Sequence, residues 1–307
     1  MNMKSNVRIL LASLSLAACA SPAPGAAVSP VVARPDPVVH VHAAGEAAFF
    51  ANAYLVETEH GVVAVDAPFT VTEAKRFRAE LDALKKPLLA VLVTHAHPDH
   101  VNGITALVEG RPEKAPIYAL SGVQKTLREI DGPKRAYWTP IYKDEYPTRT
   151  TFPDTEVKDG ETITLDGVGF TAHDVGAGES ADETVWTMEK DAFVGDLVMN
   201  RVHPWLAEGR SGAWISSLAA ARPLLAKATK VYPGHGVVGD ASALEWQKSY
   251  LEAYRAAVAE VAKGKASLDD AQKKALETRM KAFLPGAPLE ALIAMGADPV
   301  AAELSHP

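Results

Sequence analysis

The chain has 307 residues, of which 48% are hydrophobic and 22% are charged, and its formal net charge is −7. This length and apolar content are enough to bury a large core in one or two domains. Acidic and basic residues are interspersed without a basic stripe, so the composition argues against a nucleic-acid partner and otherwise says little about partners. The oligomeric state is open, and the expectation of a small-molecule substrate rests on the motifs between residues 95 and 235.

The N-terminal residues resemble a secretory signal. A short positive region precedes an apolar segment at 9–18, which is too short to span a bilayer. Residues 16–19 (Leu-Ala-Ala-Cys) are similar to a bacterial lipobox, and Cys19 is the only cysteine. The resemblance implies removal of residues 1–18 and lipidation of Cys19, so that an N-terminal lipid anchor is the only membrane attachment. Cleavage at a nearby small residue with secretion to the periplasm is the alternative.

Export places the protein in the bacterial cell envelope, on the periplasmic side. Ala20 after the cysteine, by the lipoprotein rule, points to the outer membrane. Residues 19–44 are rich in proline and alanine and are predicted to form an extended tether. We expect the main domain at 45–262 and a helical C-terminal extension at 263–307.

From residue 54 onward, apolar periodicity predicts strands alternating with helices, which is the α/β pattern. The predicted strands are at 54–56, 61–66, 88–93, 117–120, 161–165, 170–173, 185–188, 192–196 and 230–236. The predicted helices are at 71–86, 102–108, 123–130, 214–226 and 243–262, and within 267–294. Segment 131–153 breaks this rhythm with four prolines and with large aromatic rings that include Tyr137, Trp138, Tyr142 and Tyr146. It is predicted to be a lid or substrate wall, or else to pack on the body of the protein.

The strand at 88–93 runs directly into a loop that carries three imidazoles and a carboxylate: His95, His97, Asp99 and His100. Neutral imidazole and carboxylate are the usual ligands of zinc and its first-row neighbours. His95 and His97 are placed to share one ion, while Asp99 and His100 face a second. The sequence therefore predicts a metal site in this loop.

Three other predicted strands end at potential ligands: Glu179 lies in a glycine-rich loop, Asp196 ends one strand, and His235 ends another. Open α/β sheets bring such strand ends together in one crevice. Arg201, His203 and Trp205 follow Asp196 and are candidate substrate contacts. The segments 131–153 and 198–212 are expected to shape the pocket.

The loop at 95–100 resembles the His-x-His-x-Asp-His signature of the metallo-β-lactamase superfamily, and the likeness extends over 47–239. It implies an αββα sandwich and two divalent ions, zinc first and manganese or iron as alternatives. Asp196 would bridge the ions, and Asp66 would be a supporting carboxylate behind the loop. The implied reaction is attack by a metal-bridging hydroxide on an ester, thioester, lactone or lactam carbonyl, with Asp99 moving a proton or acting as a ligand only.

One position departs from that family's pattern. The third ligand of the first metal is expected to be a His, but Glu179 stands there in the sequence Gly178-Glu179-Ser180. Carboxylate is itself a valid ligand, so Glu179 is the favoured third ligand. His173 binding instead, or a weak or empty first site, are the alternatives.

The resemblance leaves the substrate open. Gly195-Asp196 is similar to the hydrolytic branches that act on thioesters, lactones and phosphodiesters, whereas the well-known lactamases have Cys or Ser at that place. A β-lactamase proper and a phosphodiesterase-type hydrolase are therefore alternatives to a general carbonyl hydrolase. A non-catalytic metal-binding envelope lipoprotein is the alternative from a different class.

Overall fold

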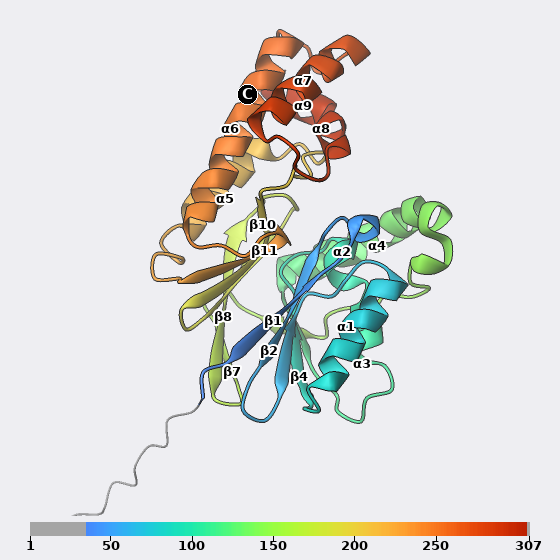
Figure 1. The fold of residues 1–307 in the computed structure, drawn as a ribbon, viewed down its shortest axis with the longest axis vertical. Helices are drawn as coiled ribbons and strands as arrows, with labels where there is room; N and C mark the ends of the chain where they lie inside the picture. Colours follow the sequence, from blue (N-terminus) through green and yellow to red (C-terminus); the bar gives the residue numbers. More distant parts are fainter. Residues whose placement is uncertain (1–34, 306–307) are drawn as a thin grey trace, which may run out of the picture. The chain divides into compact units, whose positions relative to one another are not determined.

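The computed structural model describes residues 35–305, so the predicted signal, Cys19 and most of the predicted tether lie outside the described residues. Two β-sheets stack against each other, with helices on the outer face of each (Figure 1). This is the αββα sandwich that the sequence predicts. Within residues 35–305, no helix has the length and apolar character that crossing a membrane requires.

The first sheet has six strands, and neighbours in the sheet follow the order of the chain. They are β1 (Val38–Ala43), β2 (Asn52–Glu57), β3 (Val62–Val65), β4 (Leu88–Leu92), β5 (Ile117–Leu120) and β6 (Thr155–Val157). β2 and β3 form the predicted hairpin, whereas β3, β4, β5 and β6 run parallel. β4 is almost wholly buried, which is why its sequence is a continuous apolar run.

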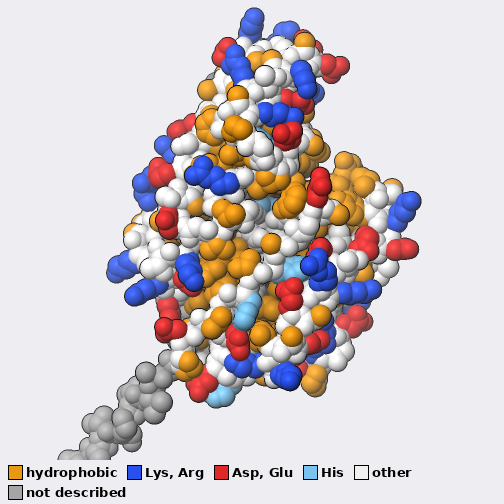
Figure 2. Space-filling view, in the orientation of Figure 1, with side chains coloured by type: hydrophobic (Ala, Val, Ile, Leu, Met, Phe, Trp, Pro, Cys, Tyr) orange, Lys and Arg blue, Asp and Glu red, His pale blue; other side chains and the backbone are white. Residues whose placement is uncertain are grey.

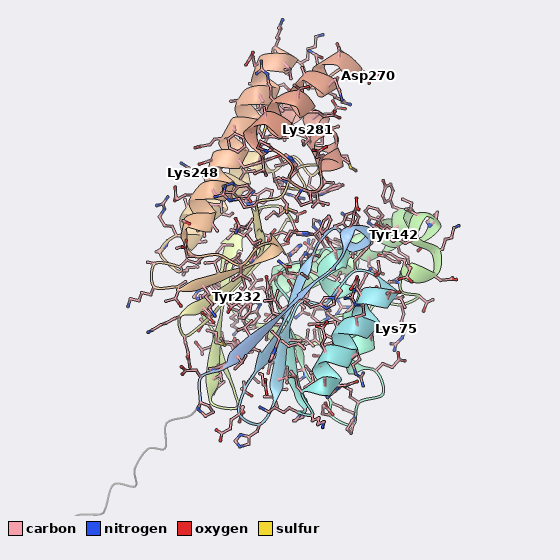
Figure 3. The ribbon with its side chains drawn as sticks, viewed as in Figure 1. Lys75, Tyr142, Tyr232, Lys248, Asp270 and Lys281 are labelled. Carbon is pink, nitrogen blue, oxygen red and sulfur yellow. The ribbon has the colours of Figure 1, made fainter. Side chains whose placement is uncertain are left out.

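The second sheet has five strands in the order β11-β10-β9-β8-β7. They are β7 (Thr162–Leu165), β8 (Val168–Gly176), β9 (Glu183–Met188), β10 (Asp191–Asn200) and β11 (Lys230–Gly236). Asp166 and Gly167, both at positive φ, make the tight turn between β7 and β8. Tyr232 of β11, labelled in Figure 3, stacks on Phe193 and meets Tyr54 of the first sheet edge-on, so aromatic rings fill the space between the sheets.

The helices before β11 pack beside the sheets. They are α1 (Val71–Ala83), α2 (Pro98–Val101), α3 (Ile104–Val108), α4 (Ser121–Tyr142) and α5 (Ser211–Ala221), with 3-10 turns at Glu46–Ala48 and Lys143–Glu145. Thr70 caps α1 by accepting a hydrogen bond from the Glu73 amide. α1, α3 and α4 accompany the first sheet, and α5 lies on the second (Figure 1).

The C-terminal helices continue from the second layer. They are α6 (Ser242–Ala262), α7 (Asp270–Phe283), α8 (Ala291–Met295) and α9 (Ala297–Ser305). Buried side chains of α6, such as Tyr250 and Leu251, share one apolar cluster with β10 and with the later helices. The predicted helical extension is therefore packed on the body rather than separate from it.

Several segments differ from the prediction. β10 does not end at Asp196 but continues to Asn200, and β6 is not among the predicted strands. β1 lies inside the predicted tether and pairs with β2, so the last residues of that segment belong to the sheet. The helix predicted at 123–130 continues to Tyr142, through Pro133 and Pro140. Proline removes helical hydrogen bonds, which is why the sequence indicated an irregular segment there. Packing of Trp138 and Tyr142 against Phe69 compensates for that loss.

Candidate metal centre

The His-rich loop is held in place by the carboxylate of Asp66 at the end of β3. That carboxylate accepts hydrogen bonds from the backbone amide of Thr94 at 2.8 Å and from its hydroxyl at 2.7 Å. It also lies 3.1 Å from His100 Nδ1. Pro98 then begins α2, at the first helical position where proline is well tolerated. These contacts place Asp66 behind the loop, as the sequence predicts.

The same network fixes the tautomers of two imidazoles. The Thr94 hydroxyl donates to Asp66, so it accepts from His95 Nδ1, 3.0 Å away. His100 Nδ1 likewise donates to Asp66. A bound metal ion would therefore meet the Nε2 lone pairs of both rings, as in metal-binding imidazoles. Without metal, burial opposes charge on His100, but Asp196 and Asp99 raise its pKa well above the usual value.

His97 lies between two carboxylates. Its Nδ1 is 2.7 Å from Glu179 Oε2, and its Nε2 is 2.8 Å from Glu208 Oε1. His95 Nε2 is 3.7 Å from the same Glu179 oxygen. His95, His97 and Glu179 thus form one compact, buried group of potential ligands, which we call the first triad.

Asp99, His100 and His235 form a second such group, the second triad. His235 Nε2 lies 3.4 Å from Asp99 Oδ2, and the Nε2 atoms of His100 and His235 are 3.4 Å apart. His235 Nδ1 donates to the carbonyl of Phe49 at 2.8 Å, which leaves Nε2 free to bind. Phe49 adopts φ of 58°, an uncommon value for a large side chain, at the turn that delivers this carbonyl.

Asp196 lies between the two triads. Its carboxylate oxygens are 3.9 Å from His95 Nε2, 3.2 Å from His100 Nε2 and 3.3 Å from His235 Nε2. Two glycines leave room for it. A Cβ at Gly234 would overlap the Asp196 carboxylate, and a Cβ at Gly195, which has a positive φ, would lie 2.6 Å from the Thr94 hydroxyl oxygen.

Unsatisfied polar atoms show that these residues fit a bound cation. His95 Nε2, Glu179 Oε2 and Asp196 Oδ1 are buried and lack hydrogen bonds of acceptable geometry, although other ligand atoms are within 4 Å. Buried polar atoms are rarely left in that state. The three atoms lie around a shared point instead of pairing with one another, which is the arrangement expected of metal ligands.

The charges of the site are strongly coupled. Burial lowers the pKa of His95, which keeps that ring neutral. Burial also opposes charge on His97 and His235, but Glu179 in the first case and Asp196 in the second outweigh it and raise each pKa to about 10. Burial raises the pKa of Glu179 to about 7, against the lowering effect of His97. Metal ions would replace the protons that these groups hold.

Two further carboxylates near the first triad were not predicted from the sequence. Glu208 belongs to the loop after β10 and also pairs with Lys134 and Arg210. Glu183, fully buried at the start of β9, accepts a hydrogen bond from the Ser180 amide at 2.8 Å, and burial raises its pKa well above the usual value. Glu183 could be predicted only from its position four residues after Glu179. No local sequence pattern predicts Glu208.

A pocket opens above the two triads. Its floor includes Asp99, Glu179 and Asp196. The walls are mostly apolar and come from four parts of the chain: Phe49 and Phe69, then Trp138 of α4, then Met199 and Trp205, then Leu289, Leu292 and Met295. Tyr142, labelled in Figure 3, packs behind this wall with its ring 4.8 Å from that of Phe69.

The remaining predicted residues occupy different positions. Trp205 lines the pocket, whereas the guanidinium of Arg201 lies 5.3 Å from the ring of Trp246 and does not. His203 is fully buried, and its Nδ1 lies 2.7 Å from the Tyr250 hydroxyl. His173 lies on β8, where its Nε2 is 2.9 Å from the Thr187 hydroxyl, and it is in neither triad. The structure thus brings Glu179, not His173, to His95 and His97.

The fold and the two triads define a class of α/β proteins in which side chains lining one pocket are able to bind metal ions. Residues 47–235 match the family profile described as Metallo-beta-lactamase superfamily. A metallo-beta-lactamase type 2 from Bacillus sp. is 27% identical over 194 residues, which is 62% of this chain and 68% of that protein. A linear primary-alkylsulfatase from Pseudomonas sp. is 34% identical over 62 residues, only 20% of this chain and 12% of that protein.

A solved structure of a beta-lactamase domain protein from Burkholderia ambifaria shares the fold. It aligns with a TM-score of 0.61 at 16% identity and covers 83% of this chain and 82% of that one. The family match spans more than half of the chain, so this protein belongs to the metallo-beta-lactamase superfamily. It is a metallo-hydrolase of unresolved substrate.

Proposed function

We propose that the two triads hold two divalent metal ions, most simply zinc, and that the protein hydrolyses an ester, thioester, lactone or lactam carbonyl. The observation that carries this proposal is the convergence of six ligand side chains on two adjacent points with Asp196 between them. When bound, such ions lower the pKa of a water molecule and polarise the substrate carbonyl oxygen.

The protein's own residues supply position and proton transfer. Asp66, Thr94 and the Phe49 carbonyl fix the ring orientations, so little reorganisation is needed when substrate binds. Asp99 lines the pocket, and His100 and His235 lower its pKa despite its burial. The Asp99 carboxylate is therefore ionised and placed to take a proton at Oδ2 and pass it to the leaving group.

We also propose that Glu179 is the third ligand of the first ion. A carboxylate there adds a negative charge where a His would be neutral, so the first ion becomes less electrophilic and the site favours harder ions such as manganese or iron. In Glu179→His we expect metal content to move towards zinc and the acidic limb of the pH–rate profile to move to lower pH. Metal analysis and that profile measure both. If neither changes, Glu179 does not tune the ion.

The test of the reaction class is a panel of hydrolase substrates offered to metal-reconstituted protein: nitrocefin, lactones, thioesters, aryl esters and phosphodiesters. We expect turnover of at least one carbonyl substrate that is abolished by a chelator and restored by metal. Turnover of phosphodiesters alone would contradict the proposal. The type 2 metallo-beta-lactamase relative makes nitrocefin the first lactam to assay.

The location of the protein is a separate proposal. Residues 1–19 supply a signal followed by a lipobox-like cysteine, and we propose a lipid anchor at Cys19 on the periplasmic side of the outer membrane. Mass spectrometry of the mature N-terminus tests it. A free N-terminus beyond Cys19 would indicate simple secretion instead.

A further inference from the structure

The C-terminal extension forms one wall of the active-site pocket, although the family match ends at residue 235. Leu289, Leu292 and Met295 come from α8 and the residues just before it. Opposite them stand Trp138 of α4 and the ring of Phe49. Figure 2 shows hydrophobic side chains on both sides of the notch between the C-terminal helices and α4.

The lining of this pocket is mostly apolar, which favours an apolar ligand. Nine of its fifteen lining residues are apolar, and five of the other six belong to the candidate metal centre. Lys134 is the sixth, and its charge is already engaged by Glu208. Met295 remains 41% exposed although it is a large apolar side chain. Covering such surface with an apolar group of a ligand is favourable, because it removes the surface from water.

This wall is held by hydrogen bonds and packing against the loop after β10 and against α6. The His203 amide donates to the Pro288 carbonyl at 3.1 Å, and the Tyr254 hydroxyl donates to the Ile293 carbonyl. A Cβ at Gly296 would lie 2.6 Å from the Leu206 Cβ, so the two segments are in close contact. The wall is therefore preformed, and a ligand need not order it on binding.

We infer that the C-terminal wall selects substrates whose acyl group is an apolar chain, with Leu292 and Met295 as specificity-determining residues. This inference rests on the proposed function, since the reacting carbonyl must sit over the two triads. The acyl chain then extends from the carbonyl along α8, away from the metal ligands.

The hydrolytic test uses 4-nitrophenyl esters from acetyl to octanoyl with the metal-loaded full chain. We expect kcat/KM to rise with each methylene group, by up to about fourfold per group. Met295→Gln keeps the size of the side chain but makes it polar, so the octanoyl-to-acetyl ratio should fall about five- to tenfold. Leu292→Gln should act in the same direction. Phe283→Gln, an exposed position of the same extension that does not line the pocket, should leave the ratio unchanged.

A binding test separates this inference from the reaction. Alkyl hydroxamates bind metal without being cleaved, so the Kd values of acetohydroxamate and octanohydroxamate can be compared by calorimetry even if no ester is hydrolysed. A tighter Kd for the octanoyl compound, lost in Met295→Gln, supports the inference when the hydrolase panel fails. Equal Kd values, or a preference that survives in both Met295→Gln and Leu292→Gln, would overturn it.

Discussion

Each triad contains two imidazoles and one carboxylate, but the groups around the two triads differ. Around the first, His97 lies between Glu179 and Glu208, and Glu183 is buried nearby. Around the second, His100 and His235 surround Asp99. The first triad thus has two further glutamates beside it, whereas the second has Asp66 and Asp196 close to its imidazoles. We infer that the two ion positions differ in strength and in metal preference, although one carboxylate, Asp196, lies between them.

The largest expected effect is at the second triad. Asp99→Asn keeps an oxygen for coordination but removes the carboxylate that accepts a proton, so turnover should fall by about 10²- to 10⁴-fold. Metal content, measured by mass spectrometry of the purified protein, should stay near the native value. A protein that only binds metal would show no turnover to lose. Retained metal with unchanged turnover would remove Asp99 from the proton path.

Stability without metal should depend on pH through His97 of the first triad and through both imidazoles of the second, His100 and His235. Burial opposes charge on each ring, but the neighbouring carboxylates raise all three pKa values. The pKa values of His97 and His235 are raised to about 10 in the folded protein, compared with about 6.5 in an unfolded chain. Their contribution is therefore complete below pH 6.5 and is lost as the pH rises through 10. Glu179, with its pKa raised to about 7, adds to the loss in the same direction.

Urea unfolding of chelator-treated protein at pH 7 and pH 10 measures this loss. Because one unit of pKa shift corresponds to about 1.4 kcal/mol, we expect the free energy of unfolding to fall by several kcal/mol. Metal-loaded protein should lose less, since its ligands already lack these protons. Comparing His97→Gln with His235→Gln then assigns the loss to one triad or the other. A flat profile for the metal-free protein would contradict the coupling.

An intermediate effect is expected at Glu208. It lies 2.8 Å from the His97 nitrogen that faces away from Glu179, and carboxylates in such positions orient metal-binding imidazoles. Glu208→Gln should weaken metal binding at the first triad by about 10- to 100-fold and leave the second triad occupied. Titration with a fluorescent zinc chelator distinguishes the two ions. Equal weakening at both would mean that Glu208 supports the loop as a whole.

Most of the metal-ligand candidates could be predicted from the sequence. The second triad, two members of the first and Asp196 lie within or beside short patterns: a six-residue loop, Gly195-Asp196, and Gly234-His235-Gly236. These patterns follow apolar strands and occur in the order of the family's motifs, so strand ends and the resemblance together predicted them. The alternation of strands and helices predicted an α/β fold, and the family resemblance implied the αββα sandwich that the two sheets form.

The features that the sequence did not predict depend on contacts between distant segments. Glu208 reaches His97 across 111 positions, and the Phe49 carbonyl reaches His235 across 186. Neither contact has a local sequence pattern that could predict it. The length of α4 was missed because its two prolines oppose a helix locally, while aromatic packing against Phe69 supports it. The pocket wall from the C-terminal helices was missed for the same reason as Glu208.

The smallest effect separates the two buried glutamates of the Glu179 loop. Burial raises the pKa of Glu183 well above its usual range, so this carboxyl is already neutral, and Glu183→Gln removes no charge. Its side-chain oxygen would still accept the Ser180 amide, and activity should change less than about threefold, as expected when a hydrogen bond is kept. Glu179→Gln removes the charged oxygen that faces His95 and His97, so the protein should lose the metal ion of the first triad. Steady-state kinetics and metal content of the two variants provide the measurement. If Glu183→Gln were as damaging as Glu179→Gln, charge beside the first triad would be shared between both glutamates, and the contrast between the triads would be larger than Glu179 alone implies.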